Sequence, residues 1–301
     1  MIDLHMHSIY SEDGDIVPAD LAKKCAAAGI ELMAVTDHNS VRANEQACAA
    51  AGAAGIDCLP GVELDCVYRG LNFHVLGYGV SDANGEFTAI EEDMNRQYRE
   101  LAMQSLKKTC ELGFEVTVEE MQAVSQWSIY PERWTGERFA EAIMQKEAYR
   151  DHPILKPYRP GGARSDNPYI NFYWDFYAQG KPCYVEMQFP SMQHALELIH
   201  SSGGVAVLAH PGNNLRGHEE LFGEIMALGF EGVEAFSSYH SAQQAAFFCR
   251  RAREEGKFCT CGSDFHGRLK PAIELGVMTF PEEIERSEIE RECRRALAHL
   301  L

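Results

Sequence analysis

The sequence predicts an α/β protein, a seven-stranded TIM-like (β/α)7 barrel interrupted by an inserted helical subdomain. Short apolar runs alternate with amphipathic segments, a pattern typical of parallel βα architecture. A histidine or an acid stands at or just after the end of each run, where βα barrels carry their active sites. The alternation stops between residues 85 and 182, which indicates the insertion.

The first half of the barrel is predicted as follows. A strand over residues 2–7 leads through a polar loop to a helix that begins near Pro18 and ends at Gly29. Proline in the first turn and glycine after the last are typical helix boundaries. A strand over 31–36 and an alanine-rich helix over 41–54 follow, and then strands over 57–64 and 71–80.

The middle of the chain is predicted to be helical. Apolar residues recur there at helical spacing, among them Leu101, Leu106 and Cys110. We therefore expect residues 1–84 and 183–301 to form the metal-binding barrel, and residues 85–182 to form a helical insertion that covers the active site.

The alternation resumes after the insertion. Helices are predicted over residues 192–202, 219–228 and 242–255, with strands over 204–209, 232–236 and 258–262, and a terminal helix from about residue 281. With the four earlier strands this makes seven, which we expect to be parallel.

Composition limits the classes of function. The 301 residues fit one barrel with an insertion, and no apolar run approaches the roughly 20 residues that span a bilayer. The first residues do not resemble an export signal, so we expect a cytoplasmic protein without a membrane partner. Ten scattered cysteines favour reduced thiols over a disulfide framework.

The formal net charge of −18 argues against binding to duplex nucleic acid, because such binders need basic surfaces. An anionic substrate must be attracted locally, and bound divalent cations can do this within an acidic protein. The sequence predicts no oligomeric state.

Potential metal ligands gather at the predicted mouth of the barrel. His5 and His7 are two apart on a strand, so their side chains point the same way and can hold one ion. Asp264 and His266 repeat this spacing, and Glu63 offers an oxygen that can bridge two ions. Mixed imidazole and carboxylate ligands suit Mn²⁺, Fe²⁺ or Zn²⁺, so we expect two or three such ions.

Two acids at strand ends have alternative interpretations. Asp37 neighbours His38 and points differently, so it is a ligand, a partner of a ligand or a helix cap. Glu234 is either part of the centre or a carboxylate satisfied within the pocket.

Six segments in order resemble motifs of the polymerase and histidinol phosphatase (PHP) superfamily: DLHMHSIYS, AVTDHN, GVEL, FHVLGYG, LAHPG and GSDFHG. The resemblance implies a distorted seven-stranded barrel and three metal ions.

The resemblance also implies ligand sets. One ion would be held by His5, His7, Glu63 and Asp264, a second by Glu63, His74 and His210, and a third by Asp13, His38 and His266. Of these, His38, Asp264 and His266 are also expected to be catalytic. Glu12 competes with Asp13 for the loop position, and Asp13 is favoured because it precedes Gly14.

The long insertion and the segment GKPCYV resemble the branch that dephosphorylates nucleoside 3′,5′-bisphosphates or trims short oligonucleotides from the 5′ end. That branch often has an Arg-Pro-His segment facing the phosphate, where this chain reads WTGERFA. Arg138 either replaces it or lies on a helix surface, and His240 either binds phosphate or caps a helix. Arg268 is a third candidate for substrate binding.

We therefore expect a phosphoric ester hydrolase that removes a phosphate monoester from a small substrate, a nucleotide, through a metal-activated hydroxide. The alternatives are a histidinol-phosphate-type phosphatase, a non-catalytic metal-stabilised PHP module and a metal-dependent amidohydrolase. No lysine stands at a strand end where an amidohydrolase would carry a carboxylated bridging ligand.

Overall fold

The computed structural model describes residues 1–301 and contains one seven-stranded sheet with strands in sequence order. The strands are β1 (Ile2–Asp3), β2 (Leu32–Val35), β3 (Asp57–Tyr68), β4 (Leu71–Tyr78), β5 (Val205–Leu208), β6 (Gly232–Ser237) and β7 (Phe258–Gly262). The sheet curls until its edges meet, because the Leu4 amide donates to the Cys261 carbonyl at 3.1 Å and Met6 bridges to Phe265. The predicted seven-stranded distorted barrel is confirmed.

The direction of one strand differs from the expectation. β4 runs antiparallel to both β3 and β5, so the prediction of seven parallel strands was wrong at β4. Only Arg69 and Gly70 separate β3 from β4, and both have positive φ angles, 51° and 77°. A parallel crossover needs a dozen or more residues, whereas a two-residue turn with positive φ makes a hairpin.

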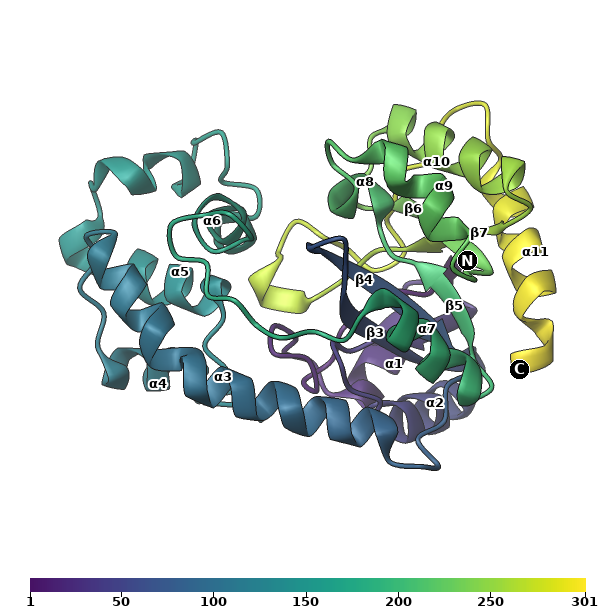
Figure 1. Ribbon diagram of the computed structural model, residues 1–301, viewed down its shortest axis with the longest axis horizontal. Coiled ribbons are helices and arrows are strands. Elements are labelled where there is room, and N and C mark those ends of the chain that lie inside the picture. Colours follow the sequence, from purple (N-terminus) through teal and green to yellow (C-terminus); the bar gives the residue numbers. More distant parts are fainter.

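Helices cover the barrel on its outside (Figure 1). They are α1 (Pro18–Ala27), α2 (Asn44–Ala53), α7 (Met192–Ser201), α8 (Pro211–Asn214), α9 (Phe222–Met226), α10 (Ala242–Glu254) and α11 (Arg286–Leu297), with 3₁₀ turns η3 (Glu219–Leu221), η4 (Gly267–Leu269) and η5 (Ala298–Leu300). The terminal helix begins later than expected, at Arg286. None of the helices has both the length and the apolar character that a bilayer-crossing segment needs.

The predicted helical insertion is present as a lobe beside the barrel, and the long helix α3 leads into it (Figure 1). It comprises α3 (Glu86–Glu111), α4 (Val118–Ser125), α5 (Gly136–Gln145) and α6 (Pro168–Phe176), with 3₁₀ turns η1 (Glu147–Tyr149) and η2 (Pro153–Tyr158). Its hydrophobic core is separate from the barrel core and is built around Phe114, Phe139 and Phe172. Cys183, one residue beyond the expected boundary, also belongs to this core.

Tyr78 connects opposite sides of the barrel interior. Its side chain is fully buried on β4, and its hydroxyl donates to the Leu4 carbonyl at 3.0 Å, next to β1. We expect Tyr78→Phe to lower the free energy of unfolding by about 1 kcal/mol, the typical net value of a buried hydrogen bond. Urea denaturation measures this. Tyr68→Phe is the control, since the Tyr68 hydroxyl bonds Glu224 at the surface, and equal losses in both variants would contradict the prediction.

Candidate metal centre

Histidines and acids from all parts of the barrel meet at one mouth. Four groups have ligand atoms within 4.8 Å of one another: His5, His7, Glu63 and Asp264; Glu63, His74 and His210; His7, Asp13, His38 and His266; and His38, Asp65 and His74. All nine residues predicted as metal ligands occur in these groups. The first two groups coincide with predicted ligand sets, and the third contains the remaining set with His7 added. Their role as ligands stays a prediction.

The Glu63 carboxylate lies at the middle of the cluster. Its Oε1 is 2.9 Å from His74 Nδ1 and 3.0 Å from His210 Nε2. Its Oε2 lies 3.2–3.3 Å from three more imidazoles, those of His5, His7 and His38. Because β3 and β4 form a hairpin, Glu63 and His74 belong to neighbouring strands and face the same interior. One carboxylate is therefore shared by five histidines.

Asp264 follows β7 and closes the first group. Its Oδ1 lies 2.9 Å from the Nε2 atoms of both His5 and His7, and its Oδ2 accepts from the Tyr239 hydroxyl at 2.6 Å. Asp264 has a positive φ of 57°, a strained conformation for this residue type that often occurs at functional sites. A Cβ at Gly262 would meet His5 Cβ at 2.3 Å, so only glycine permits this approach of β7 to His5.

The loop after β1 presents Asp13, and not Glu12, to the imidazoles. Asp13 Oδ2 lies 3.0 Å from His266 Nε2. Glu12 turns toward the insertion, where it pairs with Arg133 at 3.1 Å and accepts from the Tyr98 hydroxyl at 3.0 Å. A Cβ at position 14 would lie 1.9 Å from the Ser8 carbonyl oxygen, so the tight loop needs Gly14 directly after the acid.

The two ambiguous acids lie behind the cluster. Glu234 accepts from His5 Nδ1 at 2.9 Å and from the His210 amide at 2.8 Å. This leaves the Nε2 of His5 free to face Glu63 and Asp264, as an outer carboxylate does for a metal-binding histidine. Asp37 accepts from the Ser8 amide and hydroxyl at 2.5 and 2.6 Å and belongs to none of the four groups.

Asp65 was missed in the sequence analysis. Its Oδ1 is 3.0 Å from His74 Nε2, and its Oδ2 accepts from Asn39 Nδ2 at 2.6 Å. The sequence contained a usable signal, because Glu63 and Asp65 stand two apart on a strand and point the same way, like His5 and His7.

Lys270 was also missed in the sequence analysis. Its Nζ lies 3.0 Å from His266 Nε2, although nothing in the spacing of this loop residue indicated it.

Opposite charges within the cluster offset the effect of burial on the pKa values of its carboxylates. Burial raises the pKa of Glu63, but His5, His74 and His38 together hold that pKa well below its usual range. Burial likewise raises the pKa of Asp264, yet Lys270 and His266 keep it well below its usual value. Burial lowers the pKa of His7 to about 4, with His266 and His38 contributing, so that this ring is neutral at pH 7. Although burial lowers them, the pKa values of His5 and His74 are raised well above the usual value by neighbouring carboxylates, so a cation that binds these rings releases their protons.

The residues present fit divalent ions. His5 Nε2, His38 Nδ1 and Glu63 Oε2 are buried and have no hydrogen-bond partner, although they converge on one another. Leaving buried polar atoms unpaired is costly, and a cation among them would remove that cost. The mixed nitrogen and oxygen donors suit Mn²⁺, Fe²⁺ or Zn²⁺.

The predicted substrate-binding residues have different surroundings. Arg138 is fully buried on α5, so its alternative place on a helix surface was wrong. Its guanidinium lies 4.3 Å from the centre of the Trp127 ring, and that of Arg268 lies 4.0 Å from the same ring. Arg268 also pairs with Glu141, at 2.5 and 3.2 Å.

His240 has no free nitrogen for a phosphate. Its Nδ1 donates to the Ala235 carbonyl at 2.8 Å, and its Nε2 accepts from the Gly212 amide at 2.9 Å. The alternative of a helix cap was also wrong, since Ser241 caps α10. Through these two hydrogen bonds, His240 connects the start of α8 to β6.

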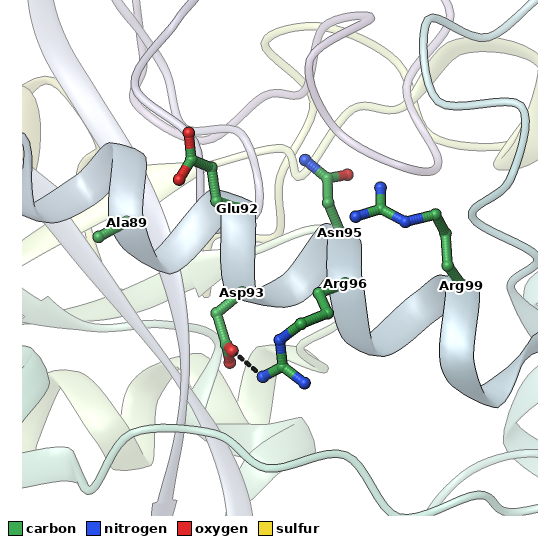
Figure 2. Close-up of a pocket in the computed structure, with 6 residues that line it drawn as sticks. All are labelled: Ala89, Glu92, Asp93, Asn95, Arg96 and Arg99. Atoms are coloured by element: carbon green, nitrogen blue, oxygen red, sulfur yellow. Dashed lines mark hydrogen bonds and ion pairs between the residues drawn. The ribbon is translucent and has the colours of Figure 1, made fainter.

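A hollow on α3 offers no competing metal site (Figure 2). Asp93, Arg96 and Arg99 line it together with Ala89, Glu92 and Asn95. Arg96 pairs with Asp93 and with Glu100, and Arg99 pairs with Glu132, so the charges of its two arginines are already balanced. None of its residues belongs to the four ligand groups.

Fold and site together define a class: a seven-stranded barrel with overlapping groups of histidines and acids at its mouth, an arrangement consistent with a site for more than one metal ion. The family model described as the PHP domain matches residues 3–152. The chain belongs to the PHP-domain family, and its relatives are phosphoesterases and exonucleases.

Three relatives extend over nearly the whole chain. A 3′,5′-nucleoside bisphosphate phosphatase from Chromobacterium violaceum is 29% identical and covers 91% of this chain and 90% of its own length. A 5′-3′ exoribonuclease from Haemophilus influenzae is 28% identical, covering 88% and 89%. A solved structure, described as an amidohydrolase from Chromobacterium violaceum with bound sulfate and no metal, superposes with a TM-score of 0.77 at 28% identity, covering 97% and 96%.

Glu63→Gln tests the shared carboxylate. We expect the wild-type chain to hold at least about two transition-metal ions after metal-replete expression, and the variant to lose at least one, because a neutral amide binds such ions poorly. Elemental analysis of the folded proteins measures this. Glu100→Gln, at an exposed position on α3, should retain the wild-type content. Equal metal content in Glu63→Gln would contradict the assignment.

Proposed function

We propose that this chain hydrolyses the phosphate monoester of a nucleotide, with a nucleoside 3′,5′-bisphosphate or the 5′ end of a short oligonucleotide as substrate. The observation that carries the proposal is the set of overlapping ligand groups around Glu63, close to an arginine with unpaired donors. The relatives described as a bisphosphate phosphatase and an exoribonuclease support the substrate class.

Bound divalent ions supply an activated water and neutralise charge on the phosphoryl group. Hydrogen bonds from other residues of the chain orient the side chains of the ligand groups. Glu234 orients His5, Tyr239 orients Asp264, and Asn39 orients Asp65. His38 is buried, and although burial lowers its pKa, Glu63 and Asp13 raise that pKa to about 8. His38 belongs to two of the ligand groups and Asp264 and His266 to one each, and we propose these three as the residues closest to the reaction.

Arg138 supports a second phosphate position. Its Nη2 donates to the Glu12 carbonyl at 2.5 Å, whereas its Nε and Nη1 are buried without partners. Burial lowers the pKa of Arg138 to about 10, so the guanidinium stays cationic at neutral pH. An unpaired buried guanidinium favours an anionic ligand, because each free N–H can donate a charge-assisted hydrogen bond to a phosphate oxygen.

The unpaired donors of Arg138 also favour the bisphosphate reaction over the three alternative functions. A histidinol-phosphate-type phosphatase acts on one phosphate and has no need for a second cationic position. A metal-stabilised module without catalysis has no chemical reason to keep unpaired donors on Arg138 beside the ligand groups. An amidohydrolase would use the activated water on a carbonyl, where the positive charge of Arg138 brings no evident benefit. The bisphosphate reaction uses all these features.

Turnover of the Mn²⁺-loaded chain tests the proposal. We expect faster hydrolysis of nucleoside 3′,5′-bisphosphates or short RNA than of histidinol phosphate and an amide substrate. His38→Ala should lower kcat/KM on the order of 100-fold or more, the usual effect of losing electrostatic stabilisation at the reacting group. His299→Ala, near the C-terminus, is the matched control. Full activity in His38→Ala would show that the assigned centre is wrong.

Arg138→Lys tests the second phosphate position while keeping a positive charge. We expect kcat/KM to fall at least about tenfold more for the bisphosphate than for a simple phosphate monoester, since a charge-assisted hydrogen bond is lost. Arg150→Lys, an exposed position on the insertion, should change neither. Equal losses on both substrates in Arg138→Lys would assign the residue to folding and not to the second phosphate.

A further inference from the structure

Lys270 places a buried ammonium group among the ligand residues. It directly follows η4 in the loop after β7 and is only 5% exposed. Its Nζ lies 3.0 Å from His266 Nε2, 3.3 Å from Asp264 Oδ2 and 3.9 Å from Asp13 Oδ2. The ammonium therefore contacts His266 and Asp13 of the group formed by His7, Asp13, His38 and His266. It reaches the group of His5, His7, Glu63 and Asp264 only through Asp264 Oδ2, which is not the oxygen that lies 2.9 Å from His5 and His7.

The atom of His266 that faces Lys270 is the one an ion would need. His266 Nδ1 lies 2.8 Å from the Asp264 carbonyl oxygen, so in the neutral ring, the form that binds a metal ion, Nδ1 donates its proton there and Nε2 carries the lone pair. That lone pair accepts from the Lys270 ammonium. One lone pair cannot serve an ammonium and a metal ion together, so the two cations exclude each other at this atom.

Asp13 shows that this position requires a cation. Its Oδ2 lies 3.0 Å from His266 Nε2, and both atoms present lone pairs to each other. A positive charge must lie beside them, and Lys270 already supplies one. Lys270 is buried, and its Nζ lies 5.7 Å from the centre of the Tyr239 ring, so its charge stays beside these atoms and repels a divalent ion that approaches them.

We infer that Lys270 competes with a divalent ion for the group of His7, Asp13, His38 and His266, so that this chain binds two ions tightly and a third more weakly. The inference rests on the metal centre of the proposed function and specifies its stoichiometry. The two groups that share Glu63, one with His5 and Asp264 and the other with His74 and His210, hold the tight ions.

Calorimetric titration of the metal-free full-length chain with Mn²⁺ tests this. We expect two tight sites and a third at least about tenfold weaker in the wild type, where tenfold is the smallest difference that such a titration separates clearly. Lys270→Met removes the charge at similar side-chain length and should bring the third affinity to within about threefold of the other two. Lys107→Met, which is 78% exposed on α3, should behave as the wild type.

The outcomes are distinct. Three equally tight ions in the wild type, or an unchanged third affinity in Lys270→Met, would overturn the inference and leave the proposed function intact. A wild-type chain that binds no Mn²⁺ would overturn both. Circular dichroism measures whether Lys270→Met is folded. If it is unfolded, Lys270→Gln is titrated in its place. The wild-type titration decides against the inference by itself if its three sites are equal.

Discussion

The burial of a carboxylate among imidazoles is the constraint on which this structure depends. Glu63 is fully buried and lies within 3.3 Å of nitrogens from five histidines, which come from four separate parts of the chain. Such a group is costly without a positive charge to compensate it, because ionised groups lose their hydration when buried. The barrel brings the strands together, and the cluster in turn requires cations. The fold and the composition of the buried cluster are therefore two aspects of one arrangement.

The β3–β4 hairpin is what allows Glu63 to be shared. In an all-parallel barrel, residues of adjacent strands reach the mouth only at their C-terminal ends. Here β3 extends to Tyr68 and β4 returns beside it, so that Asp65 pairs in register with His74 and two strands supply ligands from their middle. The antiparallel strand thus places His74, whose side chain is 28% exposed, beside the fully buried Glu63. The strained backbone of Asp264 and the glycine at position 262 serve the same close approach from β7.

Sequence predicted what periodicity and local chemistry encode. The strand positions, the insertion and the nine clustered residues followed from apolar runs, their punctuation and the motif resemblance. The direction of β4 depends on a two-residue turn, Arg69 and Gly70. The apolar pattern predicts a break between two strands at this point, but it does not predict that the second strand turns back. Lys270 could not be found, because its distance from His266 is set by the 3₁₀ turn η4 and by burial against Tyr239. The environment of His240 depends on the amide of Gly212, 28 residues away in the chain.

The insertion and the barrel meet at the same loop that carries Asp13. Glu12 bonds Arg133 and Tyr98 of the insertion through its side chain, and its carbonyl accepts from Arg138, while the next residue faces His266. Any shift of the insertion therefore moves the peptide that positions Asp13. Lys270 also faces Asp13 and His266, so residues 12 and 13 form the point at which the insertion, the barrel and the loop after β7 come together.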